Sequence, residues 1–261
     1  GAFRKNGFVE FTDFNKTIMT ARVDYRFTKK TRLENSFTWM DYYSDMTGSV
    51  DSTMFAKKTF TSQQTFTFRK ASTTRYRSTL LHEWNNNSKT TLHIVYRHNN
   101  LGQNPAYRIR DDYRRVASGW IGKKDIAHGE INENTFRSYA LTAQHRQKFS
   151  WLNALLIGGI SIDKSPNTAT ANYIRIRKDS LANKYTSYIN RTDSMLVNYK
   201  TGILNLASFV NFEFNLLKAL RVMSSVRYDV FRFDFDNKLP SSAVSGSPDT
   251  ISRFNRLSPK I

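Results

Sequence analysis

The chain has 261 residues, of which 40 are Lys or Arg and 21 are Asp or Glu, so its formal net charge is +19. It has no cysteine, which excludes a disulfide scaffold, a thiolate metal site and a cysteine nucleophile. Aromatic residues make up 14% of the chain and glycine and proline are few, which argues against disorder. Taken alone, the basic excess suggests a nucleic-acid-binding protein.

Alternation of apolar and polar residues predicts strands along nearly the whole chain. In the range 17–27, for example, the apolar Val23 and Tyr25 alternate with charged neighbours. A period of two is typical of a strand with two different faces. The same period recurs in the ranges 33–43, 62–85, 90–98, 135–147, 154–162, 204–214 and 220–232. No long segment has a helical period, so the sequence predicts an all-β fold.

The range 62–85 could be split into two strands by a turn at 71–74. However, the apolar residues on both sides, such as Phe68 and Tyr76, all have even numbers, so the two halves keep one face. We therefore expect one long strand. A further strand is expected in 7–14 and another from Phe254 onward, which gives about 8–10 strands in all.

The predicted connections alternate between short and long. The short ones are 28–32, 86–89, 148–151 and 215–219, and the long ones lie near 44–62, 99–134, 163–202 and 237–253. An antiparallel transmembrane β-barrel of the outer membrane has this pattern, with short periplasmic turns and long extracellular loops. Its strands need only about 9–11 residues, whereas no run here approaches the roughly 20 apolar residues of a membrane helix. Because lipid does not tolerate an open sheet edge, the strands either close alone or belong to a larger barrel.

Three consecutive segments near the C-terminus carry a family resemblance. Asn211–Phe214 (NFEF), 215–221 (NLLKALR) and Ser225–Asp229 (SVRYD) resemble a strand, turn and strand of TonB-dependent outer-membrane receptors, with Ser225 where that family usually has glycine. The segment 254–261 (FNRLSPKI) resembles the start of the next strand of the family.

Two earlier segments, 101–107 and 129–134, resemble loop segments of receptors of the Bacteroidetes type. The resemblance implies that residues 1–261 form a single partial barrel domain, a middle portion of a barrel of about 22 strands whose plug domain and other strands are absent here. It implies an outer-membrane uptake receptor for a ferric siderophore, a cobalamin-like compound or another scarce nutrient, energised by the TonB complex. The implied partners are the plug, the remaining strands, the TonB complex, a small ligand such as an iron chelate, and outer-membrane lipid and lipopolysaccharide.

The two longest predicted loops mix aromatic residues with arginine. Guanidinium groups and aromatic faces suit an anionic or aromatic ligand such as a chelated metal. The alternative is an ordinary solvated loop, or one that faces lipopolysaccharide phosphates. The candidates for ligand contact are Tyr107, Arg108, Arg110, Tyr113, Arg114, Arg115, Trp120, Tyr173, Arg175 and Arg177.

Arginines also recur on the polar side of the predicted strands. Those expected to face the lumen or the plug are Arg22, Arg26, Arg75, Arg77, Arg97, Arg221 and Arg227. The acidic residues expected on the same side are Asp24, Glu83, Glu213 and Asp229. In a narrow eight-stranded barrel, side chains fill the interior, and so many arginines would repel one another. A wide lumen or an acidic plug accommodates them better, which favours part of a large barrel over a self-contained small barrel of structural or enzymatic role.

Enzyme motifs are weak throughout, and we expect no catalytic residue, metal site or cofactor. G-x-S-x-G and the P-loop pattern are absent, and the five histidines lack zinc-hydrolase spacing, so a structural role is expected for each. His82 and His93 are expected on opposite faces of the sheet. The adjacent Asp111 and Asp112 have Arg110 and Arg114 as neighbours, which favours ion pairing.

A soluble basic β protein that binds nucleic acid remains an alternative, but the pattern disfavours it. The side opposite the arginines repeats Phe, Leu, Val, Tyr and Trp, and aromatics such as Tyr43 and Trp84 fall near strand ends, as interfacial girdles do. The positive charge is therefore expected to face a lumen, a plug or lipid phosphates, and no nucleic-acid partner is expected.

Overall fold

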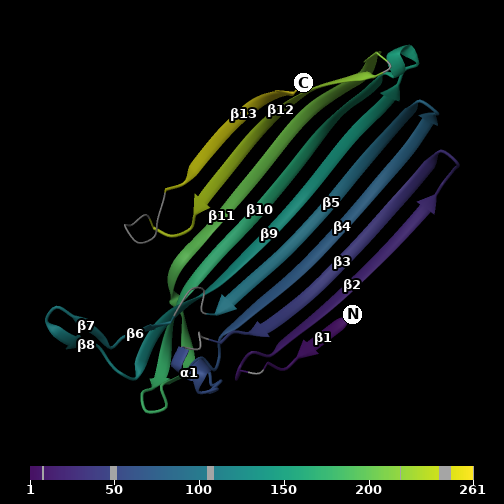
Figure 1. Cartoon of the computed structure of the whole chain (residues 1–261). Coiled ribbons are helices and arrows are strands. Elements are labelled where there is room, and N and C mark those ends of the chain that lie inside the picture. Colours follow the sequence, from purple (N-terminus) through teal and green to yellow (C-terminus); the bar gives the residue numbers. More distant parts are fainter. Residues whose placement is uncertain (8, 48–51, 105–108, 218, 241–247, 261) are drawn as a thin grey trace.

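In the computed structural model, which describes residues 1–261 except 8, 48–51, 105–108, 218, 241–247 and 261, the chain forms one large antiparallel sheet (Figure 1). Ten strands are hydrogen-bonded side by side in chain order, and the short β6 (Arg110–Asp111) adds to the edge of β9. The ten are β1 (Ala2–Lys5), β2 (Phe14–Arg26), β3 (Thr31–Asp45), β4 (Phe68–Asn85), β5 (Ser88–Asn104), β9 (Ile126–Lys148), β10 (Leu155–Asp179), β11 (Lys184–Leu217), β12 (Leu220–Asn237) and β13 (Thr250–Lys260). The predicted all-β class and the number of strands are confirmed.

The connections gather at opposite ends of the sheet. The short ones lie at one end of the strands and the long ones at the other, here called the short-connection end and the long-connection end (Figure 1). Among the residues that the structure describes, helical structure is limited to α1 (Ser52–Ala56) and the single 3₁₀ turn η1 (Trp151–Asn153). No helix in the described part of the chain is long and apolar enough to cross a membrane.

Two strand predictions differ in their outcome. β4 passes through residues 71–74 without a turn, as expected, although it begins at Phe68. The strand expected in 7–14 is wrong, because of the described residues in that range (7 and 9–14) only Phe14 lies in a strand. Side chains hold a local turn there instead: the Asp13 carboxylate accepts a hydrogen bond from the Gly7 amide at 3.0 Å, and the Thr12 hydroxyl donates to the Val9 carbonyl at 2.7 Å.

Much of the two longest predicted loops is strand. In the range 99–134, β5 continues to Asn104 and β9 begins at Ile126. In the range 163–202, only residues 180–183 lie outside β10 and β11. The backbones of these extensions pair in antiparallel ladders that continue beyond the strands expected from the sequence. The ladder between β9 and β10 is interrupted once, at Ser165 and Pro166.

The register gives the sheet two chemically different faces, because directly opposed residues on neighbouring strands point to the same side. One row across the sheet is Tyr25, Leu33, Leu80, Leu92, Ala143, Ile160, Ser208, Tyr228 and Leu257. The next row, on the other side, is Asp24, Glu34, Thr79, His93, Thr142, Ser161, Ala207, Asp229 and Arg256. We call these sides the apolar face and the polar face. The register also confirms that His82, which pairs with Thr90 on the apolar face, and His93 lie on opposite faces.

The apolar face is exposed rather than packed in a core. Val23, Tyr25 and Ile160 expose 63%, 58% and 56% of their surface. Aromatic pairs lie near both ends of this face: Tyr43 stacks on Phe68 toward the long-connection end, and Trp151 stacks near Phe214 toward the other. An exposed apolar belt with aromatic borders is the pattern of a sheet that faces lipid.

Candidate functional site

Three strands project beyond their neighbours at the long-connection end. The pairing of β11 with β12 ends at Tyr199, and the pairing of β5 with β9 ends at Asn132. Beyond these levels β9, β10 and β11 continue together, and β6 pairs with the free edge of β9 (Figure 1). We call this extension the projecting sheet.

A small apolar cluster holds the projecting sheet together. Ala127, Ile174 and Ile176 are fully buried. The segment before β4 covers them: Phe66 packs against Tyr188 with ring centroids 5.0 Å apart. Gln64 forms a bridge with Tyr185 on the outer edge of β11, and the Thr65 hydroxyl donates to the Tyr185 carbonyl at 2.8 Å. The connection between β3 and β4 is therefore anchored to a hairpin that lies far along the chain.

Three of the predicted contact residues lie on one side of β10 in this sheet. Tyr173, Arg175 and Arg177 alternate along the strand, and Arg175 and Arg177 are exposed. Both arginines line a cavity of about 530 Å³ whose other walls include Asp125, Ile126, Lys178, Asp179, Thr186 and Ile189. The cavity thus places two guanidinium groups near two carboxylates and an apolar wall, an arrangement that can bind an anion with an apolar body.

The adjacent Asp111 and Asp112 take part in ion pairs, but with other partners than the sequence predicts. Lys178 Nζ donates to Asp111 at 2.6 Å, and the Tyr185 hydroxyl donates to the same carboxylate at 2.9 Å. Lys178 Nζ also lies over the Tyr185 ring, 5.3 Å from its centroid, within the roughly 6 Å of a cation–π contact. The cation that pairs with Asp111 is thus Lys178 and not a neighbouring arginine, because the pairing of β6 with β9 turns Asp111 toward β10.

Asp112 forms a chain of contacts with His128 and Tyr173. His128 Nε2 lies 3.0 Å from Asp112 Oδ1, and the Tyr173 hydroxyl contacts the other ring nitrogen. The Lys123 amide donates to the second oxygen of Asp112 at 2.8 Å. The hydrogen bonds of Asp112 with His128 and with the Lys123 amide lower the pKa of Asp112, and the bond with His128 has the larger effect. Burial raises the pKa of Tyr173, and the charge of Asp112 adds to the rise.

The other described candidates lie in a separate hairpin. β7 (Arg114–Val116) and β8 (Gly119–Ile121) pair only with each other and extend away from the main sheet (Figure 1). Tyr113 and Trp120 stack with centroids 4.8 Å apart, and Lys124 Nζ lies 5.0 Å from the Tyr113 ring. Arg114 and Arg115 are exposed beside this stack.

The structure therefore separates the predicted contact residues into two groups. Tyr173, Arg175 and Arg177 lie on the projecting sheet, whereas Tyr113, Arg114, Arg115 and Trp120 lie on the hairpin, with Asp112 at its base joining the two through His128. Arg110 is exposed in β6 and pairs with His128 across the ladder. Tyr107 and Arg108 lie outside the described residues.

Sequence reasoning missed the residues that connect these groups. His128 is expected to be structural, and it does support the site, but its contacts with Asp112 and Tyr173 are not signalled by any spacing. Three other histidines hydrogen-bond to threonines on neighbouring strands: His82 to Thr31, His93 to Thr79 and His145 to Thr90. Among the described residues, no group of three or more potential ligands could hold a metal ion.

The seven arginines expected to face a lumen share the polar face. The register places Arg22, Arg26, Arg75, Arg77, Arg97, Arg221 and Arg227 on the same side of the sheet. That this side lines a lumen stays a prediction. Within the described part of the chain, no ion pair involves Arg26, Arg75 or Arg77.

The best-satisfied carboxylate of the polar face is one that the sequence did not single out. Asp163 accepts hydrogen bonds from Arg97 at 3.0 Å, from Ser138 at 3.0 Å and from Ser165 at 2.6 Å. Arg97 also donates to Ser138 at 2.8 Å. Three of the four predicted acidic partners do pair with arginine on this face: Asp24 with Arg22, Asp229 with Arg227, and Glu213 with Arg221.

Comparison with protein-family models found no match, and comparison with curated proteins found none either. Solved structures do match. The chain superposes on the FpvAI receptor in its complex with pyocin S2 with a TM-score of 0.71, at 12% identity, covering 98% of this chain and 34% of that one. The ferripyoverdine receptor of the outer membrane of Pseudomonas aeruginosa superposes with a TM-score of 0.69 at 12% identity, covering 99% of this chain and 34% of that one.

The closed form of the ferric-catecholate import receptor Fiu from E. coli K12 gives a TM-score of 0.68 at 9% identity, covering 96% of this chain and 41% of that one. The chain thus spans between about a third and two fifths of the length of these three structures. At such low identity the likeness concerns the fold. Over nearly its whole length, the chain has the fold of part of the β-barrel of TonB-dependent outer-membrane receptors.

Proposed function

We propose that this chain is part of the barrel of an uptake receptor in the bacterial outer membrane. The observation that carries the proposal is the exposed apolar belt on a sheet with receptor-barrel fold. In water such a belt would drive aggregation, whereas in a bilayer it faces hydrocarbon and costs nothing. The long-connection end is then extracellular and the short-connection end periplasmic.

The proposed ligand is a small anionic compound such as a ferric chelate. Arg175 and Arg177 beside their cavity, and the Tyr113–Trp120 stack beside Arg114, present cations and aromatic faces at the extracellular end. Such groups bind carboxylate-rich or catecholate chelates by paired hydrogen bonds and ring contacts. The similar structures include a ferripyoverdine receptor and a ferric-catecholate import receptor, which supports this class of ligand.

The polar face is proposed to line the barrel and to contact a plug domain. Arg26, Arg75 and Arg77 leave positive charge on that face, and an acidic plug surface would neutralise it. Energy for uptake would come from the TonB complex acting on such a plug, as the resemblance of residues 211–229 to this receptor family implies.

Membrane fractionation and uptake measurement test the proposal. The native protein that carries this chain should sediment with outer membranes, and its deletion should reduce growth on ferric chelates as the sole iron source, in a manner that also requires the TonB complex. Recovery of the protein in the soluble fraction would contradict the membrane placement. Unchanged growth on every iron, cobalamin and peptide source tested would contradict the uptake role alone.

A further inference from the structure

A cavity lies where the polar face meets the short connections. It has a volume of about 450 Å³, and the turn between β9 and β10 forms much of its wall. Three cations line it: Arg146 and Lys148 at the end of β9, and Arg221 at the start of β12. We call it the rim cavity. Its other lining residues are Asn87, Phe149, Ser150, Asn153, Ala154 and Leu155.

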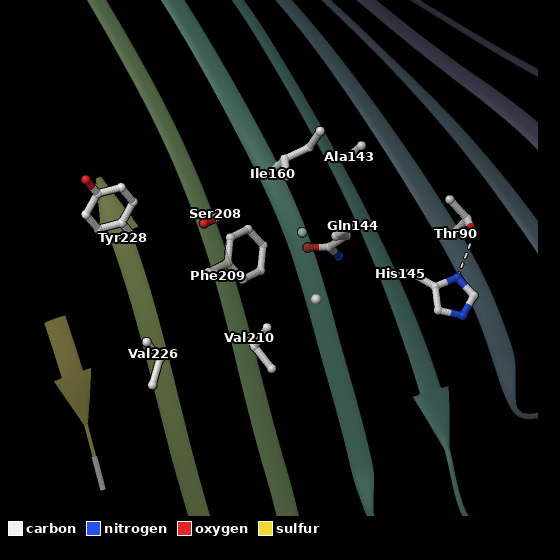
Figure 2. Close-up of a pocket in the computed structure, with 12 residues that line it drawn as sticks. Thr90, Ala143, Gln144, His145, Ile160, Ser208, Phe209, Val210, Val226 and Tyr228 are labelled. Atoms are coloured by element: carbon white, nitrogen blue, oxygen red, sulfur yellow. Dashed lines mark hydrogen bonds between the residues drawn. The ribbon is translucent and has the colours of Figure 1, made fainter. Parts of the chain in front are cut away.

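The alternation along β9 places the cations of the rim cavity on the polar face. Thr142 lies on that face, so Arg146 and Lys148, four and six residues further along the same strand, lie there too. His145, the residue before Arg146, lies on the apolar face and forms a hydrogen bond of 2.9 Å with Thr90 (Figure 2). The rim cavity therefore lies at the short-connection end of the side that is proposed to line the barrel.

The rim cavity has more positive charge than the nearby carboxylates neutralise. Lys89 and Arg146 are directly opposed on β5 and β9, and like charges in that position repel. Two carboxylates lie at this level: Glu83, opposite Lys89, and Glu213, which already pairs with the third cation of the cavity. Within the described part of the chain, no ion pair involves Lys89, Arg146 or Lys148. An anion in the cavity would relieve the repulsion.

Backbone hydrogen bonds fix the walls of the rim cavity. The Phe149 amide donates to the Ala154 carbonyl at 2.8 Å and closes the turn between β9 and β10. The Lys148 amide donates to the Asn87 carbonyl at 2.7 Å, which joins this turn to the one between β4 and β5. The Phe149 side chain is 43% exposed, so it offers an apolar surface beside the cations. The cavity thus combines fixed walls, cationic donors and an aromatic ring.

A second group of cations lies higher on the same face, and a stretch without charged side chains separates the two groups. Arg75 and Arg97 are directly opposed on β4 and β5. Arg97 and Lys89 are eight residues apart on β5, which is about 27 Å along the strand. The polar-face positions between them on β5 are Val95, His93 and Thr91. The rim cavity is therefore a separate cationic site near the end of the polar face.

We propose that the rim cavity is an exit site, which binds the carboxylate-rich anion that the receptor imports before the anion enters the periplasm. Arg146 and Arg221 donate paired hydrogen bonds to its carboxylates, Lys148 supplies a further donor, and the Phe149 ring contacts its apolar body. This inference rests on the proposed function. It goes beyond it, because it adds a second site for the same anion at the opposite end of the strands from the extracellular one.

Hydrogen exchange of the native protein that carries this chain, purified in detergent, tests the site with citrate as the probe. Citrate should slow exchange of the amides of residues 149–154. The half-maximal citrate concentration should rise about tenfold in Arg146→Gln/Lys148→Gln, because charge-assisted contacts are lost. Arg146→Lys/Lys148→Arg keeps both charges and should retain binding. The matched control Arg26→Gln/Lys29→Gln removes two exposed cations at the same end, three strands from β9, and should respond as the wild type does.

Iron uptake by cells tests the role in exit, with radioactive iron bound to the ferric chelate that supports growth of the wild type. Arg146→Gln/Lys148→Gln should bind this chelate at the cell surface with unchanged Kd but import it severalfold more slowly than the control variant. Import at the control rate would overturn the inference, as would a wild type in which citrate leaves exchange of residues 149–154 unchanged. Either result refutes this inference alone, whereas absence of growth on every chelate would refute the proposed function.

Discussion

Lys178 Nζ donates to the Asp111 carboxylate at 2.6 Å, and this ion pair joins β10 to β6 across the intervening β9. The Lys178 side chain is only 14% exposed, and the Asp111 carboxylate is the group with which it forms an ion pair. Tyr185, which also donates to Asp111, packs with Phe66 against the buried cluster of Ala127, Ile174 and Ile176.

Replacement of Asp111 by Asn should therefore loosen the projecting sheet. It leaves the Lys178 cation without its carboxylate, a loss of about 1–3 kcal/mol in local stability. Hydrogen exchange of the amides of 174–178 and 185–189 should become faster, while that of the strands within the apolar belt should not change. The control Asp193→Asn breaks an exposed pair with Arg191 and should leave these amides protected. Equal protection in both variants would contradict the role given to the ion pair.

The lowered pKa of Asp112 predicts an acid-dependent opening at the base of the hairpin. A carboxyl whose pKa is depressed in the folded state stabilises that state above the ordinary value of 3.8, and the stabilisation is lost as the pH falls through the depressed value. Asp112 accepts a hydrogen bond from the Lys123 amide. Hydrogen exchange of this amide should therefore become faster below about pH 4 than the intrinsic pH dependence of exchange predicts. In Asp112→Asn this acid step should be absent; its persistence would assign it to another carboxyl.

Arginine substitutions test the proposed ligand surface. Arg175→Gln/Arg177→Gln should raise the Kd for an anionic ferric chelate by about tenfold or more, since each guanidinium can donate two hydrogen bonds to a carboxylate. The matched control Lys57→Gln/Lys58→Gln removes two exposed cations between α1 and β4, at the same end of the molecule. Ligand titration by tryptophan fluorescence measures both. An equal loss in the two variants would point to general electrostatic attraction instead of a site at the cavity.

Two adjacent glycines in β10 should differ sharply in their tolerance of a side chain. A Cβ on Gly159 would lie 2.7 Å from the Ala143 carbonyl oxygen and 2.6 Å from the Phe209 ring, whereas Gly158 has open space. Gly159→Ala should cost about 1–3 kcal/mol, as overpacking does, and Gly158→Ala much less. Urea unfolding in detergent micelles compares the two. Equal midpoints would show that Phe209 and its strand can shift to make room.

The sequence predicted those parts of the molecule in which each strand has one apolar face. Apolar and polar residues alternate around Val23, Leu80 and Leu206. The number of strands and their order follow from that pattern. In the projecting part of β10, the buried Ile174 and Ile176 alternate with the exposed Arg175 and Arg177, so a period of two is present there as well. The range 163–202 was expected to be a loop because its arginines and tyrosines suggested a ligand surface, and most of it is strand instead.

The candidate site was predictable in composition but not in contacts. Tyr173, Arg175 and Arg177 stand out because tyrosines and arginines are concentrated in one range of the chain. Nothing near His128 in the sequence indicates that Asp112 and Tyr173 lie on either side of its ring, because these contacts depend on the pairing of β6 with β9. The partners of Asp111 likewise come from β10 and β11, far from the arginines beside it.

Pro166 interrupts the ladder between β9 and β10 two residues above Lys164. A proline has no N–H, so one carbonyl beside it must find another donor. In hydrocarbon there is none, and the loss would cost several kcal/mol, whereas among hydrated headgroups a water molecule can donate instead. Pro166 is thus tolerated only at the level of the hydrated headgroups. Its position marks the upper limit of the hydrocarbon core along β10.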